Sequence, residues 1–154
     1  MSVSAQLTLE EIHTVDVETT FSQHAKGAGA VVTFRGIMRP QSKQGEPLDA
    51  LILEWHPRMT QQSLEDIAND GLSQFNLSHV HIIHRGGVIK PHDVIVCVMV
   101  ASDHRREAFS GADYIMDRLK TDAVFWKKEQ GAFGTRWIDP TDRDHKDRQR
   151  WSEK

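Results

Sequence analysis

The amino-acid sequence predicts an α+β domain with a largely antiparallel sheet and singly inserted helices. Segments that alternate as strands follow one another with connections short enough for hairpins. Only isolated segments carry the 3.6-residue apolar repeat of a helix. The 154 residues, 38% of them hydrophobic, can form one core without metals or disulfides. Strands grouped with strands and helices inserted one at a time are typical of this class.

The first elements are weakly patterned. A loose alternation over Gln6–Glu10 predicts a strand, and Asp16 can cap a short helix that ends near His24. Clearer strands are predicted at Ala28–Met38 and Leu48–Trp55. The loop between them, residues 39–47, contains two prolines, a glycine and several polar side chains, so we expect it to be mobile.

The middle of the chain is predicted to add a helix and a hairpin. Thr60 is placed to cap a helix with an apolar stripe from Leu64 to Phe75. Strands His79–Arg85 and Asp93–Ser102 follow, joined by a loop that contains glycine and proline. Both parities of Val94–Val100 are apolar, which predicts a strand covered on both faces.

A long helix is predicted within Ser102–Glu129. Its apolar residues recur at i, i+3, i+4 and i+7 as far as Leu119, and Ser102 and Asp103 are good N-cap types. After the helix, Ala123–Glu129 and Thr135–Ile138 flank a segment with two glycines and predict a second hairpin.

Basic residues mark both ends of this helix. His104, Arg105 and Arg106 fall in its first turn, where the helix dipole favours an anion and disfavours cations. Lys120 closes the helix, and Lys127 follows seven residues later. Taken alone, each of these charges is most simply a solvated surface residue.

Arg39 adds a further candidate for binding an anion. It precedes Pro40 at the exit of a predicted strand, where the backbone is restricted to extended geometry. A guanidinium held there offers a rigid donor fork for phosphate oxygens.

The cysteine and the histidines do not indicate a reactive thiol or a metal site. Cys97 lies between two valines in the most apolar predicted strand, so we expect inert packing. Any sulfur that the protein transfers must then come from elsewhere. His79 and His81 share a strand face that His84 does not, and no cysteine or glutamate pattern completes a metal-binding set. His56 is expected to have a local structural role before its proline.

Charge and composition narrow the possible partners and the location. The net charge of −3 argues against a surface that grips a polyanion, so we expect no nucleic acid. The longest apolar run, Val94–Ala101, is too short to span a bilayer, and the N-terminus lacks the pattern of a signal peptide, which predicts a cytoplasmic protein with no membrane contact. Ten of the sixteen residues from 139 to 154 are charged. The sequence therefore predicts one domain over 1–138 and a flexible, solvated tail over 139–154.

Four segments together closely resemble the large, catalytic subunit of molybdopterin synthase: Gly29–Pro40 (GAVVTFRGIMRP), Leu53–Pro57 (LEWHP), Ser102–Glu129 with its HR, LKT and FWK motifs, and Arg136–Ile138 (RWI). The resemblance runs from about residue 27 to 139, and the order and spacing of the motifs are specific. It implies an α/β hammerhead-type fold. Arg58 departs from the glycine expected there, and a Gly86-Gly87 pair replaces a position that is often bulkier.

The resemblance implies a sulfurtransferase of molybdenum cofactor biosynthesis. In that reaction, cyclic pyranopterin monophosphate receives two sulfurs and becomes molybdopterin. The sulfur arrives as the C-terminal thiocarboxylate of a small ubiquitin-like partner subunit. The implied assembly is a central homodimer with one partner at each end, a heterotetramer, with no cofactor. The Val94–Ala101 strand and the four tryptophans are candidate interface residues.

Six residues take roles by this resemblance. Lys120 and Lys127 are the implied catalytic residues, and Lys120 is the first choice for acid–base and electrostatic work. Arg39, His104 and Arg105 are implied to bind the substrate phosphate and pterin. Arg136 is implied to add to the anion site, within the same chain or across the dimer.

Two other classes of function stay open on the sequence. One is a non-catalytic module that binds a phosphorylated ligand or single-stranded RNA, with Trp126 or Trp137 stacking on bases. The other is an adaptor whose basic pocket only receives the tail of a ubiquitin-like protein. Catalytic turnover distinguishes both of these from an enzyme.

Overall fold

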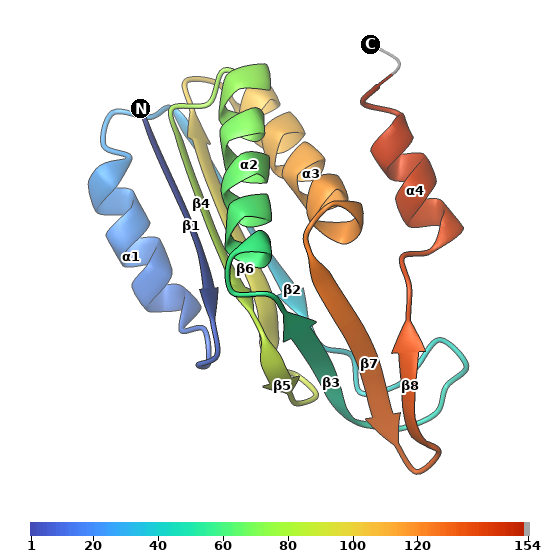
Figure 1. The fold of residues 1–154 in the computed structure, drawn as a ribbon. Helices are drawn as coiled ribbons and strands as arrows, with labels where there is room; N and C mark the ends of the chain where they lie inside the picture. The colour runs from blue at the N-terminus through green and yellow to red at the C-terminus, as the bar shows by residue number, and fades with distance from the viewer. Residues whose placement is uncertain (153–154) are drawn as a thin grey trace.

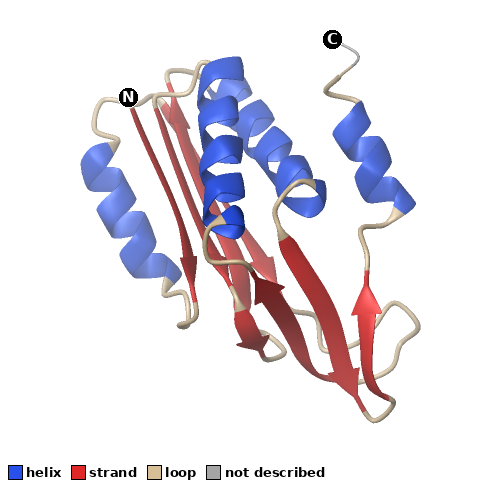
Figure 2. Ribbon diagram, in the orientation of Figure 1, coloured by secondary structure: helices blue, strands red, loops and turns tan. Residues whose placement is uncertain are grey.

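The computed structural model describes residues 1–152 and shows an α+β fold (Figures 1 and 2). This confirms the predicted fold class. Within the described residues the chain forms two four-stranded sheets and four helices. In chain order, the elements are β1 (Ser2–Thr8), α1 (Thr14–His24), β2 (Ala30–Ile37), β3 (Leu48–Trp55), α2 (Met59–Gln74), β4 (His79–Arg85), β5 (Gly87–Ile89), β6 (Val94–Ser102), α3 (Arg105–Thr121), β7 (Phe125–Gly131), β8 (Gly134–Ile138) and α4 (Asp142–Gln149).

The first sheet is sandwiched between helices. Its strand order is β1-β4-β6-β2, with β1 parallel to β4 and the other pairs antiparallel. α2 and α3 cover one face and α1 covers the other (Figure 1). Along β6, Val96, Val98 and Val100 pack in the α2–α3 cluster, whereas Cys97 and Met99 belong to the α1 cluster. The predicted strand with two covered faces is therefore confirmed.

The second sheet extends beyond the ends of α2 and α3. Its order is β5-β3-β7-β8, with every pair antiparallel, and the predicted β7–β8 hairpin is confirmed. Leu53 and Ile89 from this sheet pack against Met38, which directly follows β2. Because this small cluster joins the two sheets, it fixes the chain leaving β2 against β3 and β7.

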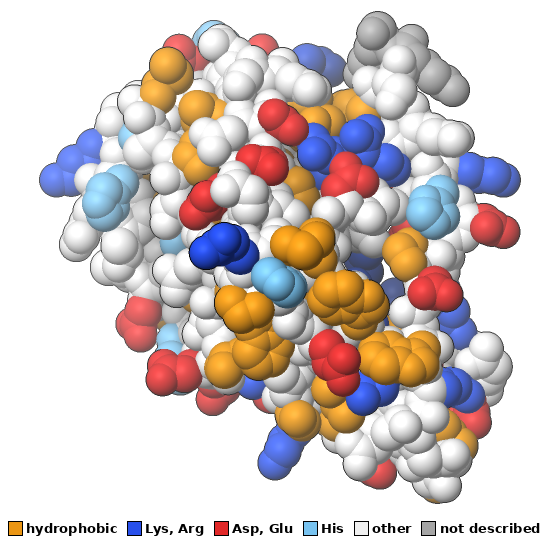
Figure 3. All heavy atoms as spheres, in the orientation of Figure 1, with side chains coloured by type: hydrophobic (Ala, Val, Ile, Leu, Met, Phe, Trp, Pro, Cys, Tyr) orange, Lys and Arg blue, Asp and Glu red, His pale blue; other side chains and the backbone are white. Residues whose placement is uncertain are grey.

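The outward face of the second sheet is partly apolar. Ile52 of β3 lies opposite Val88 of β5 on one side and opposite Lys128 of β7 on the other, and Lys128 in turn lies opposite Trp137 of β8. Residues paired in this way have their side chains on the same face of the sheet. Val88, Trp126 and Trp137 are exposed there. Figure 3 shows apolar side chains gathered over this part of the molecule. By contrast, the Val94–Ala101 strand is buried in the first sheet, so its expected role as interface material is wrong.

Several predicted element boundaries are corrected by long-range contacts. β1 begins at Ser2 because it pairs with β4, and Asp16 lies inside α1 rather than at its cap. Pairing with Ala30 keeps Ser102 in β6. The N-cap of α3 is therefore His104, without a side-chain hydrogen bond, and neither Ser102 nor Asp103 caps that helix.

The start of α2 is organised by His56. Its Nδ1 accepts the backbone N–H groups of Arg58 and Met59 at 3.2 and 3.0 Å, which confirms a local structural role. Thr60 does not act as the N-cap. Its hydroxyl accepts the N–H of His56 at 2.9 Å and donates to the carbonyl of Val124 at 2.6 Å, which ties α2 to the segment before β7.

The charged C-terminal segment differs from the solvated tail that its composition predicts. Residues 142–149 form α4, which packs against α3 and begins with a capping box between Thr141 and Asp144. After it, Arg150 pairs with Asp113 and Asp117 of α3, each at 2.7 Å. The positive charges of the segment complement acidic side chains on α3, and composition alone does not show this. Residues 153 and 154 of the predicted tail lie outside the described residues.

Among the described residues, no helix is both long enough and apolar enough to cross a bilayer.

Candidate active site

Three of the six implied site residues line one cavity of about 320 Å³. Arg39 enters it from the loop after β2, Lys120 from the last turn of α3, and Lys127 from β7. Met38 is buried and donates its N–H to the carbonyl of Asp93 at 2.9 Å, which anchors the backbone before Arg39. Residues distant in sequence thus bring three cations together.

Strand parity separates the two adjacent lysines of β7. Lys127 points into the cavity, opposite Leu53 in the strand register. Lys128 points to the outward face, where it pairs with Glu54 at 3.0 Å and lies 4.7 Å from the centre of the Trp137 ring. Lys128 therefore belongs to the outer surface and not to the cavity.

Lys127 has an unusual electrostatic environment. Burial, and then the like charge of Lys120, lower the pKa of Lys127 to about 8. A lysine with this pKa changes protonation close to physiological pH, so it can exchange a proton with a bound ligand.

His84 is a cavity residue that the sequence analysis did not assign to a site. Its ring is buried and stacks on Phe125 at 4.3 Å, and its Nδ1 donates to the carbonyl of Arg85 at 2.8 Å. Burial, with smaller contributions from Lys127 and Lys120, lowers its pKa to about 3. The ring therefore stays neutral beside the two lysines. The signal in the sequence was its position in the strand, because His84 is three residues after His81 and its side chain therefore points to the face opposite that of His79 and His81.

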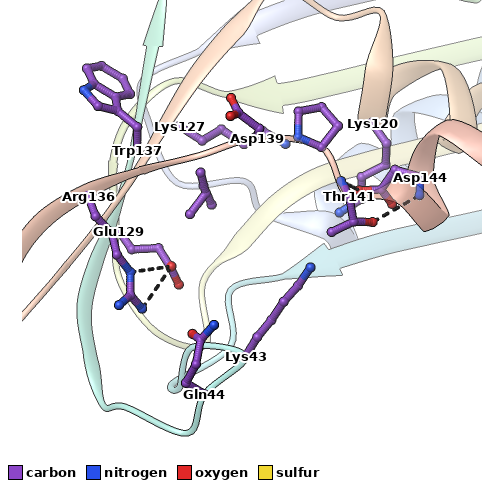
Figure 4. A pocket seen from close by; sticks show the side chains of 12 residues that line it. Lys43, Gln44, Lys120, Lys127, Glu129, Arg136, Trp137, Asp139, Thr141 and Asp144 are labelled. Carbon is purple, nitrogen blue, oxygen red and sulfur yellow. Dashed lines mark hydrogen bonds and ion pairs between the residues drawn. The ribbon is translucent and has the colours of Figure 1, made fainter.

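A neighbouring cavity of about 450 Å³ shares both lysines (Figure 4). Its other walls include Lys43 and Gln44 from the 39–47 loop and Thr141 and Asp144 from the start of α4. Burial alone would raise the pKa of Asp144, but hydrogen bonds from Thr141 and the charges of Lys120 and Lys43 lower it overall. The C-terminal segment thus supplies two acidic residues, Asp139 and Asp144, to a cavity that Glu129 and four basic residues also line.

Arg136 also lines the second cavity, but its charge is already paired. Its Nη2 lies 2.8 Å from Glu46 and its Nε lies 3.4 Å from Glu129. Hydrogen bonding to Glu46, more than any other effect, raises the pKa of the Arg136 guanidinium. Arg136 is therefore placed differently from Arg39, although the sequence gives both an anion-binding role.

His104 and Arg105 lie at the opposite end of α3 from Lys120. The fifteen residue steps from Arg105 to Lys120 correspond to about 22 Å along a helix. Both side chains are exposed, and neither they nor Arg106 makes an ion pair within residues 1–152. In one chain, this end of α3 does not contribute to the cavity of Lys120 and Lys127.

The only cysteine is not part of the site. Cys97 is fully buried on the α1 side of the first sheet, and burial raises the pKa of its thiol to about 11. The thiol therefore stays protonated and inaccessible, as expected from the sequence. Across the described residues, no group of three or more His, Cys, Asp or Glu side chains is placed to hold a metal ion.

Fold and site together define an α+β protein with a lysine- and arginine-lined pocket and without an accessible thiol. The MoaE protein family model matches residues 7–122. This chain belongs to the MoaE family, which confirms the resemblance seen in its sequence motifs.

Individual relatives agree with this assignment. The molybdopterin synthase catalytic subunit of Caulobacter vibrioides is 45% identical over 135 residues, 88% of each chain. That of Yersinia pestis is 43% identical over 141 residues, 92% of this chain and 93% of the relative. Among solved structures, a molybdopterin biosynthesis MoaE protein from Burkholderia ambifaria has a TM-score of 0.83 at 31% identity, covering 98% of this chain and 99% of that one.

Proposed function

We propose that this chain is the sulfur-transferring catalytic subunit of a molybdopterin synthase. It converts cyclic pyranopterin monophosphate to molybdopterin with sulfur from the C-terminal thiocarboxylate of a small ubiquitin-like partner. The proposal rests on the convergence of Arg39, Lys120 and Lys127 on one cavity. The only cysteine of the chain, Cys97, is fully buried outside that cavity. With no thiol of its own to offer, the protein must receive sulfur from another molecule.

The three cations suit different parts of this reaction. Arg39 offers a planar donor fork to the substrate phosphate. The Lys120 ammonium stabilises the oxyanion that develops as the thiocarboxylate sulfur attacks the substrate. Water then hydrolyses the resulting acyl thioester, so that the sulfur stays on the substrate and the partner leaves as a carboxylate. The lowered pKa of Lys127 supports assigning to it the proton transfer that accompanies opening of the cyclic phosphate at one of its ester bonds. This division moves acid–base work from Lys120, the first choice on sequence, to Lys127.

Assembly as a homodimer within a heterotetramer gives His104 and Arg105 a role. They lie too far from Lys120 to contact the same small ligand in one chain. In a dimer, the start of α3 in one subunit can reach the pocket of the other and bind its phosphate. The exposed Trp126 and Trp137 supply apolar surface for one of the subunit contacts.

Reconstitution tests the proposal directly. The purified chain is mixed with the thiocarboxylated partner and cyclic pyranopterin monophosphate, and formation of the dithiolene product is followed. We expect product only when all three components are present. Product without the partner would contradict the proposed sulfur source. Tight partner binding with no product would instead identify a non-catalytic adaptor.

The nucleic-acid alternative is not favoured by the geometry. Trp126 lies on the outward face of the second sheet, whereas Lys120 and Lys127 face the cavity. Of Trp126 and Trp137, only Trp137 lines a cavity with the lysines, and one ring does not form the platform on which successive bases of single-stranded RNA stack.

A further inference from the structure

Arg136 is held on three sides by its own chain. Besides Glu46 and Glu129, its guanidinium lies 4.0 Å from the centre of the Phe133 ring. The hydrogen bond from Arg136 is also the main reason that the pKa of Glu46 is lowered. Two carboxylates and an aromatic face satisfy this side chain, so little of its positive charge remains for a ligand.

Glu46 connects Arg136 to the 39–47 loop as a whole. Buried Ser42 organises the loop: its N–H donates to the carbonyl of Glu46 at 2.8 Å, and its hydroxyl lies 3.2 Å from the Glu46 carboxylate. The turn at the tip needs Gly45, whose φ is +83°. A bridge between Gln41 and Pro47 closes the base of the loop. Holding Glu46 therefore holds the loop tip.

The loop tip carries Lys43 to the site. Figure 4 shows this side chain extending from the loop toward Thr141 and Asp144. Lys43 lines the cavity that also contains Lys120 and Lys127. Within residues 1–152 it makes no ion pair shorter than 4.0 Å, so its charge is available at the cavity rim.

We propose that Arg136 is a positioning residue, which latches the 39–47 loop through Glu46 so that Lys43 contacts the anionic group of the substrate. Lys43 then takes the direct anion contact that the sequence motif suggests for Arg136. The identity of the substrate rests on the proposed function, whereas the latch itself is a property of the free chain. The two parts are therefore tested separately.

The substrate part is tested with a double-mutant cycle on the reconstituted complex. We expect Lys43→Ala to raise KM about fivefold, the scale of a partly screened ion pair, with little change in kcat. Glu46→Gln and Arg136→Gln should each raise KM about two- to fivefold, and the double variant no further than either single one. If Arg136 binds substrate itself, Glu46→Gln should leave KM unchanged or lower it, because a competing carboxylate is removed. That result, or additive effects in the double variant, overturns the proposal.

The latch is tested by amide hydrogen exchange on the chain alone. Glu46→Gln and Arg136→Gln should speed exchange at Gly45 and Leu48, whose N–H groups bond to carbonyls within the loop. Lys43→Ala should leave this exchange unchanged. Glu54→Gln, which removes the carboxylate from the ion pair with Lys128 in the same sheet, is the matched control and should also have no effect on the loop.

The two readouts separate the possible failures. Unchanged loop exchange in both Glu46→Gln and Arg136→Gln refutes the latch, even if the complex turns over. A wild-type complex without turnover refutes the proposed function, and loop exchange then still decides whether the latch exists.

Discussion

Replacing Lys120 with alanine tests whether the end of α3 is catalytic or only a charged helix terminus. Lys120 is exposed and makes no ion pair within the described residues, so its loss removes little native contact. An exposed cation at a helix C-terminus is worth a few tenths of a kcal/mol, and we expect a change in unfolding free energy of about that size. The variant should therefore fold and bind its partner.

The effect on the reaction should be much larger. Removing a positioned charge that stabilises an oxyanion costs about a hundredfold in rate. A second effect follows from the geometry: the like charge of Lys120 is one reason that the pKa of Lys127 is about 8, so Lys120→Ala should move that pKa upward. Single-turnover rates of the reconstituted complex, measured between about pH 6 and 10, report both effects together.

Two further variants complete this test. Lys120→Arg keeps the charge, so the pKa of Lys127 should stay low, but the rate should recover only in part because a guanidinium is larger and spreads its charge over a planar group of another shape. Lys146→Ala, at an exposed position of α4, is the control and should leave the rate and the pH profile unchanged. A Lys120→Ala complex with the wild-type single-turnover rate would remove Lys120 from the mechanism.

Three other predictions concern stability and assembly. The pKa of Lys127 in the folded protein lies below its unfolded value of 10.5, so the charged lysine destabilises the fold below about pH 8, and the unfolding free energy rises between about pH 8 and 10.5. Lys127→Met should therefore raise the unfolding free energy by about 1–2 kcal/mol at pH 7 and remove the rise with pH in urea titrations. It should also abolish turnover. A lower unfolding free energy of Lys127→Met at pH 7 would show instead that the lysine does not destabilise the fold. Cys97→Ser should cost about 1–3 kcal/mol, because it buries a hydroxyl among apolar groups, and should leave single-turnover rates intact; a lost reaction in a folded variant would reopen a role for the thiol. Light scattering of the purified chain at micromolar concentration should give the mass of a dimer, and a strictly monomeric mass would count against cross-subunit roles for His104 and Arg105.

Local patterns in the sequence were sufficient for most of the fold. The strands at Leu48–Trp55 and His79–Arg85 have the predicted bounds because alternation and turn residues are local signals. The N-cap of α3 was wrong because Ser102 is held extended by Ala30, more than seventy residues earlier. The C-terminal helix was missed for a similar reason, since Arg150 is matched to acidic side chains on α3 that composition cannot locate.

The candidate site was predictable only where a motif names a residue and the fold leaves it unpaired. Arg39, Lys120 and Lys127 meet these conditions. Arg136 is in a motif too, but Glu46, ninety residues earlier, pairs with it, and no local pattern shows that contact. His84 had no motif of its own, and only its strand parity separated it from the other histidines. The separation of His104 from Lys120, in contrast, follows from helix geometry alone.

Candidate functional residues lie at both ends of α3, with Arg105 at the start and Lys120 in the last turn. The helix between them limits which insertions and deletions the protein can tolerate. Inserting one residue in a helix rotates everything after it by about 100° and advances it by about 1.5 Å. In α3 such an insertion would turn Ile115 and Leu119 out of the core and swing Lys120 away from its cavity. The middle of the helix is equally constrained, since any side chain at Gly111 would meet Leu77 at 2.8 Å. Insertions or deletions between Arg105 and Lys120 are therefore compatible with the core only in whole turns.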